Sequence, residues 1–583
     1  MSREIAQVRA TDPLRAPAEG GVTVRMYGQG LGDCFLLAFG PDDQTRPHYV
    51  LIDCGVVLGT PDAVNRMRTV VENIGVAVGP HGIDLLVVTH EHWDHVSGFS
   101  QAADLWKTIP IRKIWLAWTE NPDDDLGKKL KAEFRNNIRA LQATALRAEA
   151  PDRRERFNGL VGLYGDPFAA RGDAFSEQTH AALDTLLKVA PGPGQVEYLE
   201  PGDVRWLGDP SVATVYVLGP PKDETRLKKT NPSRRAPETY PKPGESDGLH
   251  LLATPALTEH GAFRLALGWS ASEFDPDPAA QDPDSTHAPH PGPTDAHGLT
   301  GALSAVSQAA PAGDPVGPRL SPAEELLREQ SFPFEPQHRI PWRAAARDPF
   351  FVRRYGFETP YPGGPETGET WRRINDDWLG VADALALQMD SYTNNTSLVL
   401  AFDLHRSRRV LLFAADAQVG NWLSWHDITR GTNAEGNPVP VSVADLLAGT
   451  CVYKVGHHGS HNATVREGGL ESMAKGGDLV AFVPVSEPVA HEIKHWDEMP
   501  LPSLMDRLHQ LCDGRVLRPA PAPCLVPEVP NKRWTEFLAR VQVAGSLLPA
   551  KQRRRPDGSM EELEPEVPLF VQYGVADVPV PHR

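Results

Sequence analysis

The segment Thr-His-Glu-His-Trp-Asp-His at residues 89–95 holds the side chains with the clearest chemical potential. It follows an apolar, β-branched run at 84–89. Side chains two apart on an extended segment point the same way, so His90 and His92 can converge on one cation. Asp94 and His95 lie on the turn that follows and can reach a second. Imidazoles and carboxylates are ligands for Zn²⁺ and similar metals. The pattern therefore predicts a metal site, in preference to a polar loop with chance histidines.

The order His-x-His-x-Asp-His after an apolar strand resembles the signature of the metallo-β-lactamase superfamily. The resemblance implies roles for residues in other segments. Asp53, at the end of the run 49–53, corresponds to a buried aspartate that supports the site. Asp416 corresponds to a carboxylate that bridges two metals. His458 corresponds to a ligand of the second metal, with His457 beside it in a supporting or substrate-facing role.

Three further motifs are similar to those of ComEC-type β-lactamase domains and occur in the same order: Gly-Gln-Gly-Leu-Gly-Asp at 28–33, Asn-Asn-Thr-Ser-Leu-Val-Leu at 394–400 and His-His-Gly-Ser at 457–460. One departure concerns the first metal. Most superfamily hydrolases supply a third histidine just before this strand, whereas this chain has Asn394 and Asn395 there. Because an amide is a weaker ligand than imidazole, we expect a weak metal ligand or substrate contact, or a preference for Mn²⁺. Asn394 is equally compatible with a plain turn residue.

The resemblance implies a metal-dependent hydrolase. Two divalent ions, Zn or Mn, bridged by Asp416 and water, would generate a hydroxide nucleophile near neutral pH. Asp94 would both ligate metal and orient the hydroxide, and Asp53 would fix the imidazole tautomers. The catalytic set is thus Asp94, Asp53 and His457. No Gly-x-Ser-x-Gly motif points to a serine nucleophile.

Three hypotheses about the function and its substrate stay open. A phosphodiesterase or nuclease, acting on nucleic acid or a nucleotide, comes first because relatives of this type cleave phosphodiesters. Basic clusters at 128–139, 226–235 and 551–555 offer local contacts for it. However, such clusters are usually solvated faces, and a net charge of −18 disfavours tight binding to long DNA.

The second hypothesis is a hydrolase of small esters, lactones or amides. It predicts a deep apolar pocket, lined by Trp93, Trp115 or Trp118, although core packing is the commoner role of tryptophan. The third is a binding module with a degenerate site, which only the missing third histidine supports.

The length and composition of the chain limit the folds that could position these residues. A chain of 583 residues allows several domains or one large domain with insertions. Five cysteines without a CxxC pair suit a reducing, cytoplasmic setting. No apolar run approaches the roughly 20 residues of a membrane helix, so we expect no membrane contact. The oligomeric state stays open.

Short apolar runs alternate with helical patterns, which favours an α/β class. Together with the resemblance, they imply a metallo-β-lactamase αββα sandwich with a large insertion and a C-terminal extension. We expect its halves at 1–220 and 391–515. The insertion at 221–390 would cap the metal edge and contains a low-complexity loop at 274–318, and the extension is 516–583. The predicted strands are 22–26, 35–39, 49–52, 84–89, 111–118, 212–218, 398–402, 410–415, 452–455, 479–485 and 569–573. The predicted helices are 64–74, 123–150, 181–189, 371–389, 502–511 and 534–541.

Overall fold

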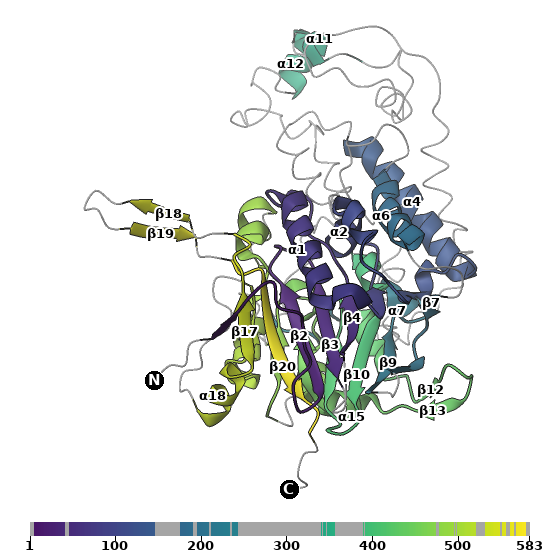
Figure 1. Ribbon diagram of the computed structural model, residues 1–583. Coiled ribbons are helices and arrows are strands. Elements are labelled where there is room, and N and C mark those ends of the chain that lie inside the picture. Colours follow the sequence, from purple (N-terminus) through teal and green to yellow (C-terminus); the bar gives the residue numbers. More distant parts are fainter. Residues whose placement is uncertain are drawn as a thin grey trace.

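The computed structural model describes residues 5–40, 46–145, 175–189, 195–208, 212–233, 236–242, 340, 342–345, 347–355, 389, 391–473, 477–494, 496, 498–519, 531–548, 551–554, 560–564 and 567–578. Two large sheets dominate this part of the chain (Figure 1). The loop predicted at 274–318 and most of the helix predicted at 371–389 lie outside the described residues.

The first sheet has nine strands and combines both ends of the chain. In spatial order its strands are β1 (Ala6–Val8), β17 (Val541–Ala544), β20 (Phe570–Ala576), β2 (Gly21–Tyr27), β3 (Phe35–Gly40), β4 (His48–Ile52), β5 (Leu85–Val88), β6 (Ile114–Ala117) and β7 (Val196–Leu199). The segment 516–583, set apart above as an extension, thus supplies β17 and β20, with β20 hydrogen-bonded to β2.

The second sheet has seven strands. In order they are β16 (Val516–Leu517), β15 (Val480–Phe482), β14 (Thr450–Lys454), β11 (Val410–Phe413), β10 (Val399–Leu404), β9 (Ala213–Gly219) and β8 (Val204–Leu207). Two small hairpins complete the strands: β12 (Arg430–Thr432) with β13 (Pro438–Pro440), and β18 (Lys551–Arg554) with β19 (Met560–Glu564).

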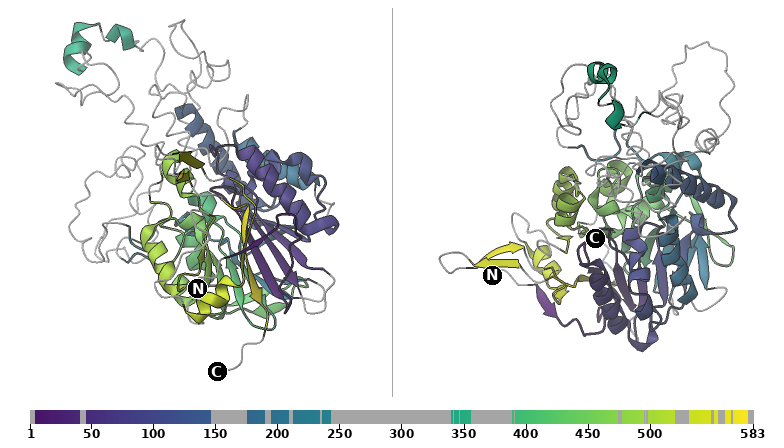
Figure 2. Two further views of the ribbon diagram at one scale, coloured as in Figure 1. Left: turned by 60° about the vertical axis from the view of Figure 1, so that its left-hand side comes forward. Right: turned by 90° about the horizontal axis from the view of Figure 1, so that it is seen from above.

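The two sheets stack face to face with helices on both outer sides (Figure 2, left). Phe35 of β3 meets Phe413 and Phe482 of the second sheet edge to face, with ring centroids 5.5 and 6.1 Å apart. Strands buried on both faces explain the nearly continuous apolar runs of the sequence. In β4, for example, Val50 contributes to the core between the sheets and Leu51 to the core beneath the helices.

The helices divide between the two outer faces. Outside the first sheet lie α1 (Ala63–Val78), α2 (Trp93–Gln101), α3 (Ala103–Trp106) and α6 (Phe175–Val189). Outside the second lie α14 (Val419–Trp425), α15 (Val443–Ala448), α16 (Glu471–Met473) and α17 (Pro502–Leu511). The remaining helices are α4 (Asp125–Ala145), α7 (Glu224–Lys228), α11 (Trp342–Ala345), α12 (Pro349–Tyr355) and α18 (Lys532–Leu538).

The α/β class predicted from the sequence is confirmed. The described part of the insertion comprises residues 221–233, 236–242, 340, 342–345, 347–355 and 389. Its first part, which includes α7, lies against the second sheet's loops. The Asn395 amide donates to the Leu227 and Lys229 carbonyls, and Asn462 donates to the Thr230 carbonyl. None of the described helices is both long and apolar enough to span a membrane.

Candidate metal centre

The loops that follow β4, β5, β11 and β14 meet at one edge of the stacked sheets. Each pair of strands, β4 with β5 and β11 with β14, runs parallel, so the carboxyl ends of both strands point to the same edge. Leu398 N–H donates to the Thr89 carbonyl at 2.9 Å and ties the two sheets together there. The His90–His95 segment and Asp416 are thereby brought together although they lie more than three hundred positions apart in the sequence.

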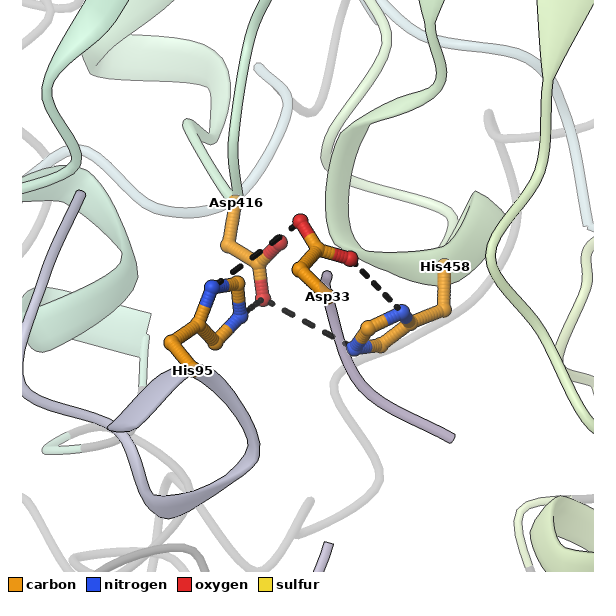
Figure 3. Close-up of side chains that lie close together, drawn as sticks. All are labelled: Asp33, His95, Asp416 and His458. Atoms are coloured by element: carbon orange, nitrogen blue, oxygen red, sulfur yellow. Dashed lines mark hydrogen bonds and ion pairs between the residues drawn. The ribbon is translucent and has the colours of Figure 1, made fainter. Parts of the chain in front are cut away.

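Four buried side chains form the centre of this edge: Asp33, His95, Asp416 and His458 (Figure 3). Their ligand atoms all lie within 4.8 Å of one another. His95 Nε2 is 3.1 Å from Asp416 Oδ2, and His458 Nε2 is 4.0 Å from the same oxygen. The early histidine cluster therefore faces the late aspartate and histidine, as a shared metal site requires.

Asp53 orients His95 from behind. Its Oδ2 lies 2.8 Å from His95 Nδ1, and its two oxygens accept hydrogen bonds from the backbone N–H and the hydroxyl of Thr89. Since Nδ1 is held by Asp53, His95 presents Nε2 to Asp416. The contact has the geometry of the carboxylate–histidine pairs that fix ligand tautomers in metal sites; the supporting role of Asp53 stays a prediction.

His458 is oriented in the same way by the backbone. Its Nδ1 donates to the Pro484 carbonyl at 2.9 Å, which leaves Nε2 facing Asp94 Oδ2 at 3.0 Å. Burial alone would lower the pKa of His458, but the hydrogen bond to Asp94 and the charge of Asp416 raise it more. The pKa of His95 is likewise raised against the effect of burial, chiefly by Asp416. The carboxylates around these two rings therefore favour a positive charge at this place.

His90 and His92 form a second pair beside the four central residues. His90 Nε2 lies 3.0 Å from His92 Nδ1, so the two rings do converge. Burial lowers the pKa of His92 to about 4 and holds the pKa of His90 well below its usual range. Both are therefore neutral at physiological pH, which is the form that binds a metal.

Lys454 and Asp33 are the site residues that the sequence argument missed. Lys454 ends β14 and is buried; its Nζ lies 2.5 Å from Asp33 Oδ2 and 3.1 Å from Asp416 Oδ1, and it donates to the Ala415 carbonyl. Asp33 ends the Gly-Gln-Gly-Leu-Gly-Asp motif and Lys454 precedes the His-His-Gly-Ser motif. Neither motif indicates by itself that a lysine and an aspartate so distant in sequence form an ion pair.

The remaining residues predicted for the site are His457, Asn394 and Asn395. His457 lies next to His458 with its Nδ1 3.0 Å from the Ser460 hydroxyl, and burial lowers its pKa to about 4. Asn394 is buried just before β10. Asn395 is buried too, but its amide oxygen accepts from the backbone N–H groups of Gln418 and Asn421, and its amide nitrogen binds two carbonyls. Asn395 therefore fixes the loops and has no atom left for a metal.

Backbone strain and close packing concentrate in the site loops. Seven described non-glycine residues have positive φ, and four of them are Asp53, Ala415, His457 and His458. Such residues persist where the surroundings demand them, typically at functional sites. Gly55 allows the two loops of the first sheet to approach, because a Cβ there would lie 2.4 Å from the Asp94 carbonyl carbon.

The donor set fits divalent cations. Asp33, Asp53, Asp94 and Asp416 are all at least 98% buried, while Lys454 brings one permanent positive charge against them. Asp33 Oδ1 and Asp94 Oδ1 are buried and accept no hydrogen bond from the described residues. Buried carboxylates of this density are costly unless cations compensate them. The cluster can therefore hold at least one metal ion.

The surroundings bear on the substrate hypotheses. Trp115 lies in the core between the sheets, as tryptophan commonly does, rather than in a pocket. Within the predicted basic clusters, Lys129 and Lys228 pair with Glu224, Lys131 pairs with Glu120, and Arg226 pairs with Asp427. These four basic side chains thus form salt bridges within the chain, and the nuclease hypothesis stays a prediction.

Comparison with known proteins does not extend this account: no family model matches the chain, and no curated protein is detectably similar to it in sequence. A functional conclusion therefore depends on the chemistry of the site residues, since a fold alone does not define an activity.

Proposed function

We propose that the chain is a metal-dependent hydrolase of the metallo-β-lactamase type and that it cleaves phosphodiesters. The observation that carries the proposal is the meeting of His90, His92, Asp94 and His95 with Asp416 and His458 at one buried edge. Two face-to-face sheets with helices outside agree with the αββα sandwich of that superfamily.

The residues divide into two candidate ligand groups. His90 and His92 converge on one side, whereas Asp94, His95 and His458 surround the other, and Asp416 Oδ2 faces the second group. Divalent cations such as Zn²⁺ or Mn²⁺ held there would lower the pKa of water and neutralise charge on the attacked oxygen.

The protein's own groups would prepare the reaction. Burial would raise the pKa of Asp94, but His95 and His458 lower it well below its usual range, so the carboxylate stays ionised. Its Oδ1 accepts no hydrogen bond from the described residues and is free to accept one from the attacking water. Asp53 and the Pro484 carbonyl keep the His95 and His458 rings from rotating.

The test combines metal analysis with turnover. We expect purified protein to contain Zn or Mn and to hydrolyse bis-p-nitrophenyl phosphate. Asp416→Ala and His92→Ala should each lower kcat/KM by at least about 100-fold, the scale of losing a metal-centred catalyst. His81→Ala, an exposed histidine in the turn after α1, is the matched control and should retain wild-type activity.

The outcomes separate the three hypotheses. Metal together with turnover of carboxyl esters or lactones alone would replace the phosphodiesterase by the small-ester hydrolase. Absence of bound metal after incubation with Zn²⁺ and Mn²⁺ would leave only the binding module. Full activity in Asp416→Ala would overturn the assignment of the site.

A further inference from the structure

The loop between β15 and α17 is fixed against the candidate metal centre at both ends. At its start, the Pro484 carbonyl accepts the hydrogen bond from His458 Nδ1 at 2.9 Å. At its end, Leu501 N–H donates to the Gly459 carbonyl at 2.8 Å. The same short turn that presents His458 therefore anchors the whole loop.

The middle of this loop reaches the other sheet's site loop and carries Lys494. A Cβ on Gly59, in the segment that follows Asp53, would lie 3.7 Å from Ile493 Cγ2. Lys494 comes next, directly after η11 (Val489–Ile493), and is partly buried. Lys494 thus belongs to the loop whose two ends contact the His458 turn and whose Ile493 side chain faces the segment that follows Asp53.

Among the described residues, the ammonium group of Lys494 has no carboxylate partner. No described acidic oxygen lies within 4.0 Å of its Nζ, and the centroid of the Trp496 ring lies 6.0 Å from Nζ. Asp94 is the acidic group whose charge acts on it. Burial lowers the pKa of Lys494 to about 8, and Asp94 partly opposes that effect, so the side chain is still mainly charged at pH 7.

Lys494 differs in this respect from the other lysines around the site. Lys131 is 2.8 Å from Glu120, Lys242 is 3.2 Å from Glu498, and Lys454 is 2.5 Å from Asp33. A partly desolvated cation without a counter-charge is costly. The uncompensated charge of Lys494, near a group of candidate metal ligands, could instead be balanced by an anionic substrate.

We propose that Lys494 forms an anion subsite beside the metal centre and binds a non-bridging oxygen of a small phosphodiester. This inference rests on the proposed function, because it names the substrate group that the same site would hold. A single cation rather than a row of them favours a small diester over a long nucleic acid, which needs many phosphate contacts.

The direct test measures binding of dimethyl phosphate to the metal-loaded protein by calorimetry. Lys494→Gln should weaken the affinity about tenfold, the scale of one charge-assisted hydrogen bond. Lys494→Arg should stay within about threefold of wild type, because it keeps the charge. Lys532→Gln removes an exposed lysine that pairs with Glu536 and is the matched control; its affinity should equal that of wild type. All four proteins should carry the same amount of metal.

A second measurement compares KM for an anionic substrate with KM for a neutral one. Lys494→Gln should raise KM for bis-p-nitrophenyl phosphate, an anion, by about tenfold. The KM for neutral p-nitrophenyl acetate should not change. Equal loss for both substrates would indicate a structural effect and overturn the subsite.

The two proposals fail separately. Equal affinity of wild type and Lys494→Gln for dimethyl phosphate, or no binding to wild type, overturns the anion subsite even if the enzyme turns over diesters. Binding of dimethyl phosphate that depends on Lys494, without turnover of any phosphodiester, supports the subsite and overturns the phosphodiesterase.

Discussion

At the scale of single residues, the question that the structure sharpens is which carboxylates would hold metal. Asp33 is one of the four residues whose ligand atoms lie close together, yet its Oδ2 forms an ion pair with Lys454 Nζ at 2.5 Å. Asp94 faces His458 Nε2 at 3.0 Å and no lysine amine lies within ion-pair distance of it among the described residues. Lys454 also binds Asp416 Oδ1, so Asp416 presents its other oxygen to the histidines.

We therefore expect Asp33→Asn and Asp94→Asn to differ in metal content. Asp94→Asn should lose about one metal equivalent, because an amide is a poor ligand for Zn²⁺. Asp33→Asn should keep the wild-type amount, since an amide oxygen can still accept a hydrogen bond from Lys454. Elemental analysis of the two purified variants after dialysis measures this. Loss of metal from Asp33→Asn alone would show that Asp33 is the ligand and Asp94 is not.

The same residues show how far a sequence argument reaches. His90, His92, Asp94 and His95 stand together in the chain, so their meeting follows from local geometry. That Asp416 and His458 join them was implied only through the resemblance. The role of Lys454 depends on Asp33, more than four hundred positions away, and no local pattern indicates such a pair.

At the scale of elements, the two sheets repeat one arrangement. In the first sheet, β20, β2, β3 and β4 pair antiparallel and β4 to β7 pair parallel. In the second, β8 to β11 pair antiparallel and β11, β14, β15 and β16 pair parallel. Asp53 follows β4 as Asp416 follows β11, and the early histidines follow β5 as His457 and His458 follow β14. The sequence shows no repeat, so this correspondence could not be predicted from it.

The apolar runs predicted most strands, because residues buried on both faces of a sheet must be apolar. They could not give the order of the strands. In particular, β20 lies between β17 and β2, although the sequence around Phe570 reads as one more run in a separate tail. Strand order depends on contacts between distant segments, which apolar patterning does not encode.

Asp84 shows what holds the parallel strands β4 and β5 in place. It lies just before β5, is buried, and accepts hydrogen bonds from both terminal nitrogens of the Arg46 guanidinium at 2.8 Å and from the Tyr49 N–H of β4 at 2.9 Å. Burial would raise the pKa of Asp84, but the bonds from Arg46 and Tyr49 lower it more. The folded pKa is thus below the ordinary value of 3.8.

Asp84→Asn should lower the free energy of unfolding by about 1–3 kcal/mol at pH 7, as expected for a buried, charge-assisted network. Because the folded pKa is depressed, the carboxylate stabilises the wild type fully above its unfolded pKa. That stability is lost as the pH falls through the folded value, so the two proteins should converge at a pH below it. Urea titrations at both pH values measure the difference. A deficit that stays constant with pH would show that packing, not charge, explains it.

At the scale of the whole molecule, the candidate metal centre is a buried place where loops of the two sheets make polar contacts with each other. His95 of the first sheet's loops meets Asp416 of the second at 3.1 Å, and Asp94 meets His458 at 3.0 Å. The described cluster of hydrophobic side chains packed between the sheets surrounds no such polar group. A cation bound between these groups would therefore compensate the charge of buried carboxylates and join the two halves of the chain. It would stabilise the folded state over the unfolded state by an amount set by its concentration relative to Kd.

Removal of metal should consequently destabilise the entire fold and not only abolish turnover. At a free metal concentration of about 100 times Kd, the linkage is about 2.7 kcal/mol, so a chelator should lower Tm by several degrees, and excess Mn²⁺ or Zn²⁺ should restore it. Scanning calorimetry of wild type before and after chelation measures the shift. Asp416→Asn is the control, because a protein that no longer holds the cation should show a Tm that is insensitive to the chelator. A wild-type protein proved to be stripped of metal, with Tm unchanged, would contradict the role of the cation as a tie between the sheets.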